Sequence, residues 1–263
     1  MTPSQHDPLL NSPTLRVISA GAAKGLIQDL EDHVCRVLSP TSPLQLQCSF
    51  GAVGAMKDIF LSEIQASRPT NWAGVVMISS ESILLDLIES SLLEASSLTP
   101  VGWVSTAVAR LEGDQSIHAM HDEHALKEAL LQSPIIYAPD TEKSTAGIHF
   151  KKVLNDLALW PTLKERVQNF PNGAAAMGQM AKDQIKGALG CTQVTEINYT
   201  PGVEVVSRLP QRFELNTLYS AARAKEDAKS TLNGHLADAF IDLVCGKHAE
   251  AQRARLEGGF FDH

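Results

Sequence analysis

Two short segments of this chain combine hydroxyl, amide and ionisable side chains at points where an apolar run ends. The first is Ser144-Thr145-Ala146-Gly147-Ile148-His149, and the second is Gly190-Cys191-Thr192-Gln193-Val194-Thr195-Glu196. Hydroxyl groups and the free backbone N–H groups at the start of a helix are common donors to small anions. The two segments therefore predict a site for a small, negatively charged ligand.

Two side chains in these segments could move a proton. His149 carries an imidazole that acts as acid or base near neutral pH, although its position also fits a histidine packed one turn beyond the anion site. Glu196 would repel an anion unless its carboxylate is the working base, or unless it is paired elsewhere at a helix N-terminus or a hinge. We predict His149 and Glu196 as catalytic residues if the protein is an enzyme.

Four junctions between a predicted strand and a predicted helix are rich in small and hydroxyl residues. They are Ser19-Ala20-Gly21-Ala22, Ser49-Phe50-Gly51-Ala52, Ser144-Thr145-Ala146-Gly147 and Thr192-Gln193-Val194-Thr195. Ligands of open α/β sheets bind beside helix N-termini at the carboxyl ends of strands, so we expect the four junctions to line one cleft. The predicted ligand-binding residues are Ser19, Gly21, Lys24, Ser49, Gly51, Ser144, Thr145, Gly147, Gln193 and Thr195.

The elements that position these junctions alternate short apolar strands with amphipathic helices, which is typical of an α/β fold. The predicted strands are 15–19, 44–50, 74–78, 134–138 and 188–194, with an extended crossover at 101–109. Residues 203–209 and 213–222 are predicted to return the chain to the first lobe. The predicted helices are 22–38, 53–66, 81–93, 123–131, 145–157, 163–170, 173–186 and 225–245. Residues 1–14 are polar and proline-rich, and we predict a disordered segment there.

Composition limits the classes of function. The chain has 263 residues and a net charge of −8, which argues against nucleic-acid binding. No secretory signal and no run of about 18 apolar residues is present, so we expect a cytosolic protein without a membrane span. Neither a metal nor a cofactor is expected, and His118, His121 and His124 are predicted to form a surface cluster. Four widely spaced cysteines are predicted to be free, buried thiols: Cys35, Cys48, Cys191 and Cys245.

The order of several segments resembles the periplasmic molybdate-binding protein family, whose members are type II solute-binding proteins. These segments are SAGAAKGL, SFGAVGAM, VVMISS, PDTEKSTAGIHFKKVL, FPNGAAAM and GALGCTQVTEINYTPGV. The resemblance implies two α/β lobes with mixed sheets flanked by helices and a ligand cleft between the lobes. Lobe 1 would contain residues 15–100 and 210–263, and lobe 2 would contain residues 101–209.

The family holds its oxyanion with serine hydroxyls in the first two junctions and a tyrosine in the last. This chain has Gly21-Ala22 and Gly51-Ala52 at the first two positions and Gln193 at the last. Fewer hydroxyl groups imply a roomier pocket with a different set of hydrogen bonds. The scaffold also resembles that of aconitate isomerase, an enzyme that moves a double bond in a small tricarboxylate.

The leading prediction is a cofactor-independent cytosolic isomerase that shifts a double bond in a small di- or tricarboxylate. Ser19, Ser49, Ser144, Thr145 and backbone N–H groups would hold the carboxylates. The alternative is a non-catalytic binding protein for an oxyanion or an organic acid. It would be the periplasmic substrate-binding component of an ABC transporter, with a membrane permease as its partner. A third interpretation is a sensor whose lobes close on a ligand to recruit a partner.

Overall fold

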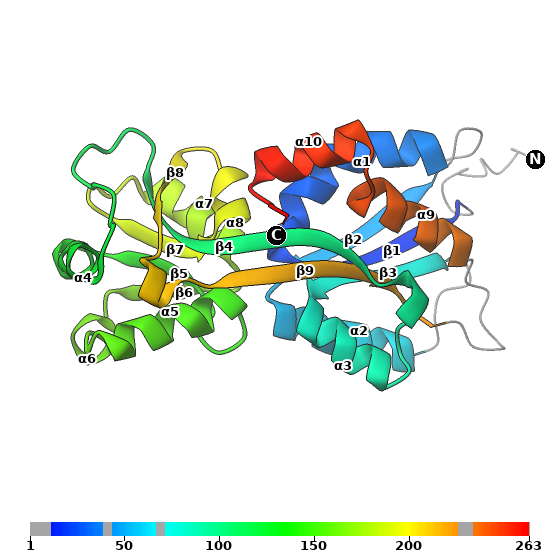
Figure 1. Cartoon of the computed structure of the whole chain (residues 1–263), viewed down its shortest axis with the longest axis horizontal. Coiled ribbons are helices and arrows are strands. Elements are labelled where there is room, and N and C mark those ends of the chain that lie inside the picture. The colour runs from blue at the N-terminus through cyan, green and yellow to red at the C-terminus, as the bar shows by residue number, and fades with distance from the viewer. Residues whose placement is uncertain (1–11, 39–43, 67–71, 226–233, 263) are drawn as a thin grey trace, which may run out of the picture.

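The computed structural model describes residues 12–38, 44–66, 72–225 and 234–262. Their arrangement as strands flanked by helices confirms the predicted α/β fold (Figure 1). The strands are β1 (Thr14–Ala20), β2 (Gln45–Gly51), β3 (Trp72–Ser80), β4 (Thr99–Leu111), β5 (Ile136–Pro139), β6 (Val167–Phe170), β7 (Leu189–Gln193), β8 (Val203–Arg208) and β9 (Asn216–Arg223). The helices are α1 (Lys24–Leu38), α2 (Val53–Gln65), α3 (Glu81–Glu89), α4 (Glu123–Gln132), α5 (Thr145–Asp156), α6 (Trp160–Leu163), α7 (Gly173–Asp183), α8 (Val194–Asn198), α9 (Gly234–Cys245) and α10 (Ala249–Gly258). Short 3-10 turns occur at η2 (Gly21–Ala23), η3 (Ala95–Ser97) and η4 (Gln211–Phe213).

The strands of the described residues run in the order β2-β1-β3-β9-β4-β7-β5-β6, with β8 also paired to β4. Strand β1 is parallel to β2 and β3, β5 is parallel to β6 and β7, and β4 and β9 are antiparallel to their neighbours. The first part of β4 pairs with β9, and its second part pairs with β7 and β8. The predicted mixed sheets are therefore continuous through β4.

Figure 1 shows β4 and β9 as two long strands that connect two groups of elements. We call β1–β3, α1–α3, α9 and α10 the first lobe, and β5–β8 and α4–α8 the second lobe. Where one lobe ends along the connecting strands, near residues 100 and 210, stays a prediction.

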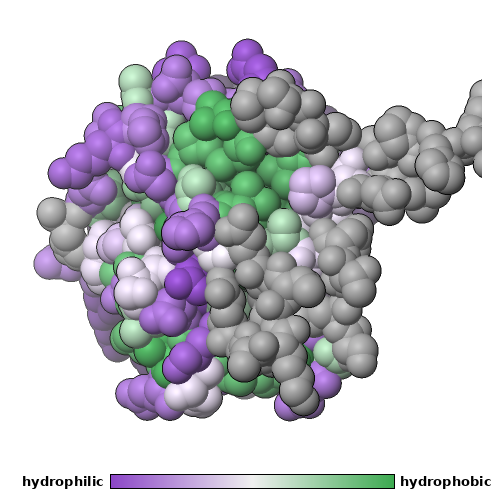
Figure 2. Space-filling model, turned by 90° about the vertical axis from the view of Figure 1, so that its right-hand side faces the viewer, coloured by the Kyte–Doolittle hydropathy of each residue, from purple (hydrophilic) through white to green (hydrophobic). Residues whose placement is uncertain are grey.

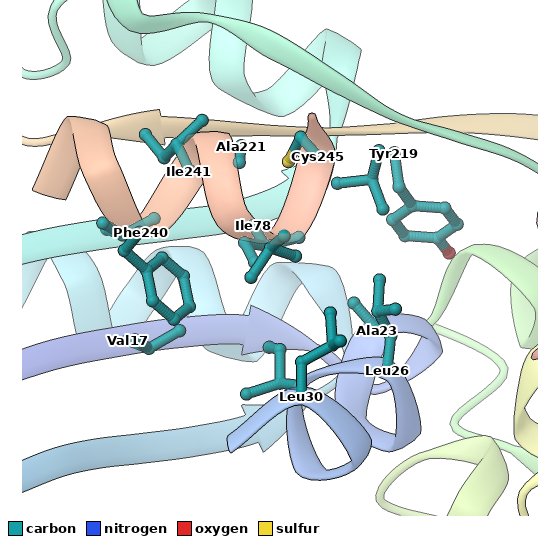
Figure 3. Packing of buried hydrophobic residues seen from close by; sticks show 14 of the residues in the cluster. Val17, Ala23, Leu26, Leu30, Ile78, Tyr219, Ala221, Phe240, Ile241 and Cys245 are labelled. Atoms are coloured by element: carbon teal, nitrogen blue, oxygen red, sulfur yellow. The ribbon is translucent and has the colours of Figure 1, made fainter. Parts of the chain in front are cut away.

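The core of the first lobe lies where α1 and α9 cover the sheet (Figure 3). Leu26 and Leu30 lie four residues apart and so project from the same side of α1. They meet Phe240 of α9 and Val17 of β1, and all four side chains are buried. The second lobe has its own cores on the two faces of its strands. Each lobe therefore holds its strand ends in place by burying its own apolar side chains.

Residues 163–170 are not a helix, and that prediction was wrong. Leu163 ends the short helix α6, and residues 167–170 form strand β6 at the edge of the sheet. Leu163, Val167 and Phe170 have helical spacing, but the segment pairs in parallel with β5 over four residues. The hydrogen bonds available from β5 outweigh the local pattern, because tertiary pairing routinely overrides a short periodic signal.

Three smaller differences concern element ends. Helix α8 begins at Val194, where the prediction placed the end of a strand, and Thr14 already belongs to β1. Helix α9 covers Gly234–Cys245 of the predicted helix at 225–245. Residues 226–233, like most of the predicted disordered segment, lie outside the described residues.

None of the helices in the described residues combines the length and the apolar composition that crossing a lipid bilayer requires. Figure 2 looks at the right-hand end of Figure 1, where hydrophobic and hydrophilic residues of the first lobe both reach the surface. His118, His121 and His124 are exposed, which agrees with the predicted surface cluster. The four cysteines are free thiols, as predicted, but only Cys191 and Cys245 are buried, whereas Cys35 and Cys48 are partly exposed.

A buried ion pair ties β1 to α2. The Arg16 guanidinium, whose side chain is 4% exposed, donates from Nε and Nη2 to the Glu63 carboxylate at 2.9 and 2.7 Å. Removing one partner of such a pair leaves an uncompensated buried charge. Glu63 is itself 26% exposed, and Arg16 keeps other acceptors, so the loss is smaller than for a fully buried pair.

We expect Glu63→Ala to lower the free energy of unfolding by about 2 kcal/mol, measured by urea denaturation. The control is Asp86→Ala, which removes the exposed pair with Lys57 and should change the stability little. Equal effects of the two substitutions would contradict the structural role of the Arg16–Glu63 pair.

Candidate functional site

The four predicted junctions line one cavity between the lobes. Its empty volume is about 240 Å³, which includes space open to solvent. The lining residues are Ala20, Gly21, Ala22, Gly51, Ala52, Val53, Ser144, Thr145, Asn172, Gln193, Glu196 and Tyr219. The expectation of a pocket roomier than that of the resembled family stays a prediction. The two sides already touch, because the Gly54 N–H donates to the Lys143 carbonyl at 3.4 Å.

All four junctions present helix starts that have no side-chain cap. Ala20 precedes η2 and α1, Ala52 precedes α2, Ser144 precedes α5 and Gln193 precedes α8, and none of the four makes a capping hydrogen bond. The first N–H groups of a helix have no partner inside the helix and are normally satisfied by such a cap. Ser144 has the right side chain for capping, yet its hydroxyl oxygen accepts from no N–H group at the start of α5. The lining of the cavity therefore includes positive helix ends whose N–H groups no side chain caps, although the Gly54 N–H of α2 is bonded to the Lys143 carbonyl.

A further helix start at the cavity, that of α7, is already occupied by a carboxylate of the chain itself. Glu196 lies on α8 and accepts hydrogen bonds from the Gly173 N–H at 3.1 Å and from the Thr192 hydroxyl at 2.5 Å. Gly173 is the first residue of α7, and Asn172 caps the same helix by accepting from the Ala175 N–H. Glu196 thus occupies the anion position at the start of α7.

Burial of Glu196 opposes its ionisation. Burial raises the pKa of its carboxyl, while hydrogen bonds from Thr192 and from the backbone N–H groups of Ala174, Gly173 and Gln193 act in the opposite direction. Glu196 also reaches the first lobe, since a Cβ atom at position 21 would lie 2.5 Å from Oε1 of Glu196. Gly21 is therefore required for the close approach of this carboxylate.

Gln193 and Tyr219 supply the neutral polar groups of the cavity. Gln193 Nε2 donates to the Tyr219 hydroxyl at 3.3 Å, whereas Gln193 Oε1 is buried and has no hydrogen-bond partner. Figure 3 shows the Tyr219 ring at the edge of the first-lobe core, with its hydroxyl oxygen pointing away from the apolar side chains. Burial and the charge of Glu196 raise the pKa of Tyr219, which therefore stays a neutral O–H donor.

The cavity lining contains no lysine, arginine or histidine. Its positive potential comes from helix starts and its donors are neutral, while its one ionisable carboxyl is Glu196. Such a site suits a small anion held by many hydrogen bonds rather than by ion pairs.

A family model described as bacterial extracellular solute-binding protein matches residues 15–260. The chain belongs to this family. No curated protein sequence matches the chain significantly. Solved structures of solute-binding proteins share its fold. They confirm the resemblance to molybdate-binding proteins, which have the type II solute-binding fold.

Three of these structures cover almost the whole chain. The periplasmic molybdate-binding protein of Azotobacter vinelandii has a TM-score of 0.66 and 16% identity, over 94% of this chain and 98% of its own. A substrate-binding domain from Clostridium difficile, assigned to a molybdenum ABC transporter, has a TM-score of 0.62 and 16% identity, over 96% and 100%. The sulfate-binding protein of Mycobacterium tuberculosis H37Rv has a TM-score of 0.63 and 16% identity, over 95% and 86%.

Membership of the solute-binding family corrects the leading prediction. The family model and the solved structures point to binding rather than to isomerisation, and the family is extracellular rather than cytosolic. His149, the predicted proton carrier, is not among the lining residues. Its Nε2 lies 2.7 Å from the Phe213 carbonyl, so the imidazole connects α5 to η4 outside the cavity.

Several predicted ligand residues of the solute-binding protein have other partners. The Ser19 hydroxyl donates to the Ala20 carbonyl, and the Ser49 hydroxyl accepts from the Arg16 guanidinium. At position 147 a Cβ atom would lie 2.2 Å from the Asp140 carbonyl oxygen, so this glycine allows α5 to pack on the preceding loop. Ser19, Ser49 and Gly147 therefore do not line the cavity.

Lys24 and Thr195 line a neighbouring hollow on the other side of Glu196, beside Gly25 and Tyr199. Cys191 is buried and lines neither hollow.

The sequence analysis did not predict two residues that line the cavity, Asn172 and Tyr219. Asn172 stands before Gly173 and a helical run, which is an N-cap signal at the start of a helix. Tyr219 lies within a continuous strand, where no local feature distinguishes a cavity-lining tyrosine from a core one.

Proposed function

We propose that this chain is the substrate-binding component of an ABC importer and that it captures a small anion outside the cell membrane. The cavity between the lobes supports this function, because four uncapped helix starts and the partnerless Gln193 Oε1 surround one small space. Solved neighbours with the same fold are described as molybdate- and sulfate-binding proteins, which favours an oxyanion or a similarly small organic acid.

In this proposal the ligand receives hydrogen bonds from both lobes. The first lobe contributes the N–H groups at the starts of α1 and α2, and β9 contributes the Tyr219 hydroxyl. The second lobe contributes Ser144 and Thr145 at the start of α5. A ligand that bridges the two sides holds the lobes together, and the closed pair would then present a surface to the permease.

The test is a thermal-denaturation screen with molybdate, sulfate, phosphate and citrate, followed by isothermal titration calorimetry. At a concentration 100 times its Kd, a bound anion should stabilise the folded state by about 2.7 kcal/mol and raise the Tm. Sodium chloride at the same ionic strength controls for general salt effects. Failure of all four anions to bind would contradict the proposed function for these ligand classes.

A further inference from the structure

The first backbone donors of helix α7 are all used inside the chain. The Gly173 and Ala174 N–H groups bond to the Glu196 carboxylate. The Ala175 N–H donates to Oδ1 of Asn172 at 2.8 Å. Gly173, Ala174 and Ala175 are the first three residues of α7, and their N–H groups have no partner within the helix. These N–H groups are therefore unavailable to a ligand, although α7 begins at the cavity.

The cap of α7 fixes which way the Asn172 amide points. Its Oδ1 must face the helix start, because only the oxygen of an amide accepts from an N–H group. The Asn172 backbone carbonyl is also used, since it accepts from the Ala176 N–H at 3.1 Å. In the part of the chain that the structure describes, Nδ2 of Asn172 donates to no protein group. Nδ2, which carries two hydrogens, is therefore the free end of this side chain.

Asn172 lies where the two lobes meet at the cavity. It is half-buried and lines the cavity together with Gly21 and Ala22 of the first lobe. A Cβ atom at position 21 would lie 3.6 Å from Cβ of Asn172, so the asparagine packs against the first lobe at a glycine. Polar groups in such partly buried places normally have a hydrogen-bond partner. The unused Nδ2 donor therefore points to an acceptor that the protein itself does not supply.

We infer that Nδ2 of Asn172 donates a hydrogen bond to an oxygen of the bound anion. This inference rests on the proposed anion-binding function. Glu196 takes the N–H groups at the start of α7, and the N-cap side chain supplies the donor that the backbone of α7 cannot. The partner is a charged oxygen of a tetrahedral oxyanion or of a carboxylate, because a hydrogen bond to an ionised acceptor is stronger than one to a neutral acceptor.

The test compares wild type with Asn172→Ser and Asn172→Ala by calorimetric titration of sulfate, molybdate and phosphate. Serine caps a helix about as well as asparagine but has no amide group, whereas alanine has neither function. Both variants should bind each anion that wild type binds about 10- to 100-fold more weakly, which is the usual loss for a hydrogen bond to a charged group. In urea denaturation, Asn172→Ser should match wild type, and Asn172→Ala should unfold at a lower urea concentration.

Asp122→Ala is the matched control for the loss of a cap. Asp122 caps α4 of the second lobe by accepting from the Ala125 N–H at 2.8 Å, and it does not line the cavity. This variant should lose stability as Asn172→Ala does, but it should keep the anion affinity of wild type. Wild-type affinity in Asn172→Ser would show that Asn172 serves only as a cap, and it would overturn the inference.

A second measurement observes the side-chain amide directly by nuclear magnetic resonance. The two Nδ2 proton signals of Asn172 are those missing from the spectrum of ¹⁵N-labelled Asn172→Ser. They should move downfield when the tightest-binding of the three anions saturates the labelled wild type. Unshifted signals together with calorimetric binding would overturn the inference while leaving the anion-binding function intact. Absence of binding by sulfate, molybdate and phosphate would overturn both.

Discussion

The Ala52→Asp variant is expected to lose about 1,000-fold in anion affinity while its fold becomes slightly more stable than that of wild type. Ala52 is the N-cap residue of α2, has extended backbone angles and lines the cavity. Aspartate is among the best N-cap residues, so the new carboxylate finds backbone donors and stabilises the helix by about 1 kcal/mol. At about 4 Å from a bound anion, it would repel each ligand charge by about 4 kcal/mol at an effective dielectric constant of 20, which corresponds to roughly three orders of magnitude in Kd.

The matched control for this variant is Ala52→Asn. Asparagine caps a helix about as well as aspartate and has nearly the same size, but it carries no charge. Calorimetric titration with the best anion of the screen should show a much smaller loss of affinity for Ala52→Asn than for Ala52→Asp. Urea denaturation of the two variants should show similar stabilities. Equal losses of affinity would mean that volume rather than charge governs this wall of the cavity.

The convergence of the four junctions could be predicted because it follows from the fold class. Strands β1 and β2 are parallel, so Gly21, directly after β1, and Gly51, the last residue of β2, lie at the same end of these strands. Ser144 comes after β5 and Gln193 is the last residue of β7, and these two strands are parallel to each other in the second lobe. Small residues at these positions already indicated where backbone N–H groups are accessible. The position of the cavity between the lobes could therefore be predicted from the strand order and from the small residues at the strand ends.

The role of each hydroxyl could not be read in the same way. Ser49 has the residue type and the position of a ligand donor, but its hydroxyl accepts from Arg16, which lies 33 residues earlier. A buried guanidinium needs acceptors, and the sequence does not show which ones it meets in the fold. Tyr219 could not be predicted for the same reason, because its strand β9 is distant in sequence from the other elements that line the cavity.

One ground of the isomerase prediction was the loss of serine hydroxyls relative to the resembled family. In the structure, uncapped helix starts and the Tyr219 hydroxyl provide donors in the same cavity, so fewer serines do not require a larger or different ligand. Every residue except proline has a backbone N–H group, so residue types do not show which N–H groups face a ligand, beyond the preference for small residues beside them. This is why binding and catalysis could not be separated from the sequence.

The contact between the lobes around Tyr199 provides the largest predicted effect on stability. Tyr199 follows α8 of the second lobe, and its hydroxyl donates to the Ala254 carbonyl of α10 at 3.2 Å. Its ring lies so close to α1 that a Cβ atom at position 25 would lie 2.0 to 2.3 Å from three ring carbons. Gly25 is buried and the Tyr199 ring is held between α1 and α10. Neither the ring nor the α1 backbone can therefore move to make room for a Cβ atom without disrupting this packing.

We expect Gly25→Ala to lower the free energy of unfolding by about 3 kcal/mol, measured by urea denaturation. Helix propensity alone would give the opposite sign, since alanine is favoured over glycine inside a helix by about 1 kcal/mol. Gly178 on α7 tests this directly, because a Cβ atom there meets nothing within 4 Å. Gly178→Ala should therefore stabilise the protein by about 0.5–1 kcal/mol. A stabilising Gly25→Ala would show that Tyr199 does not pack between the lobes in solution.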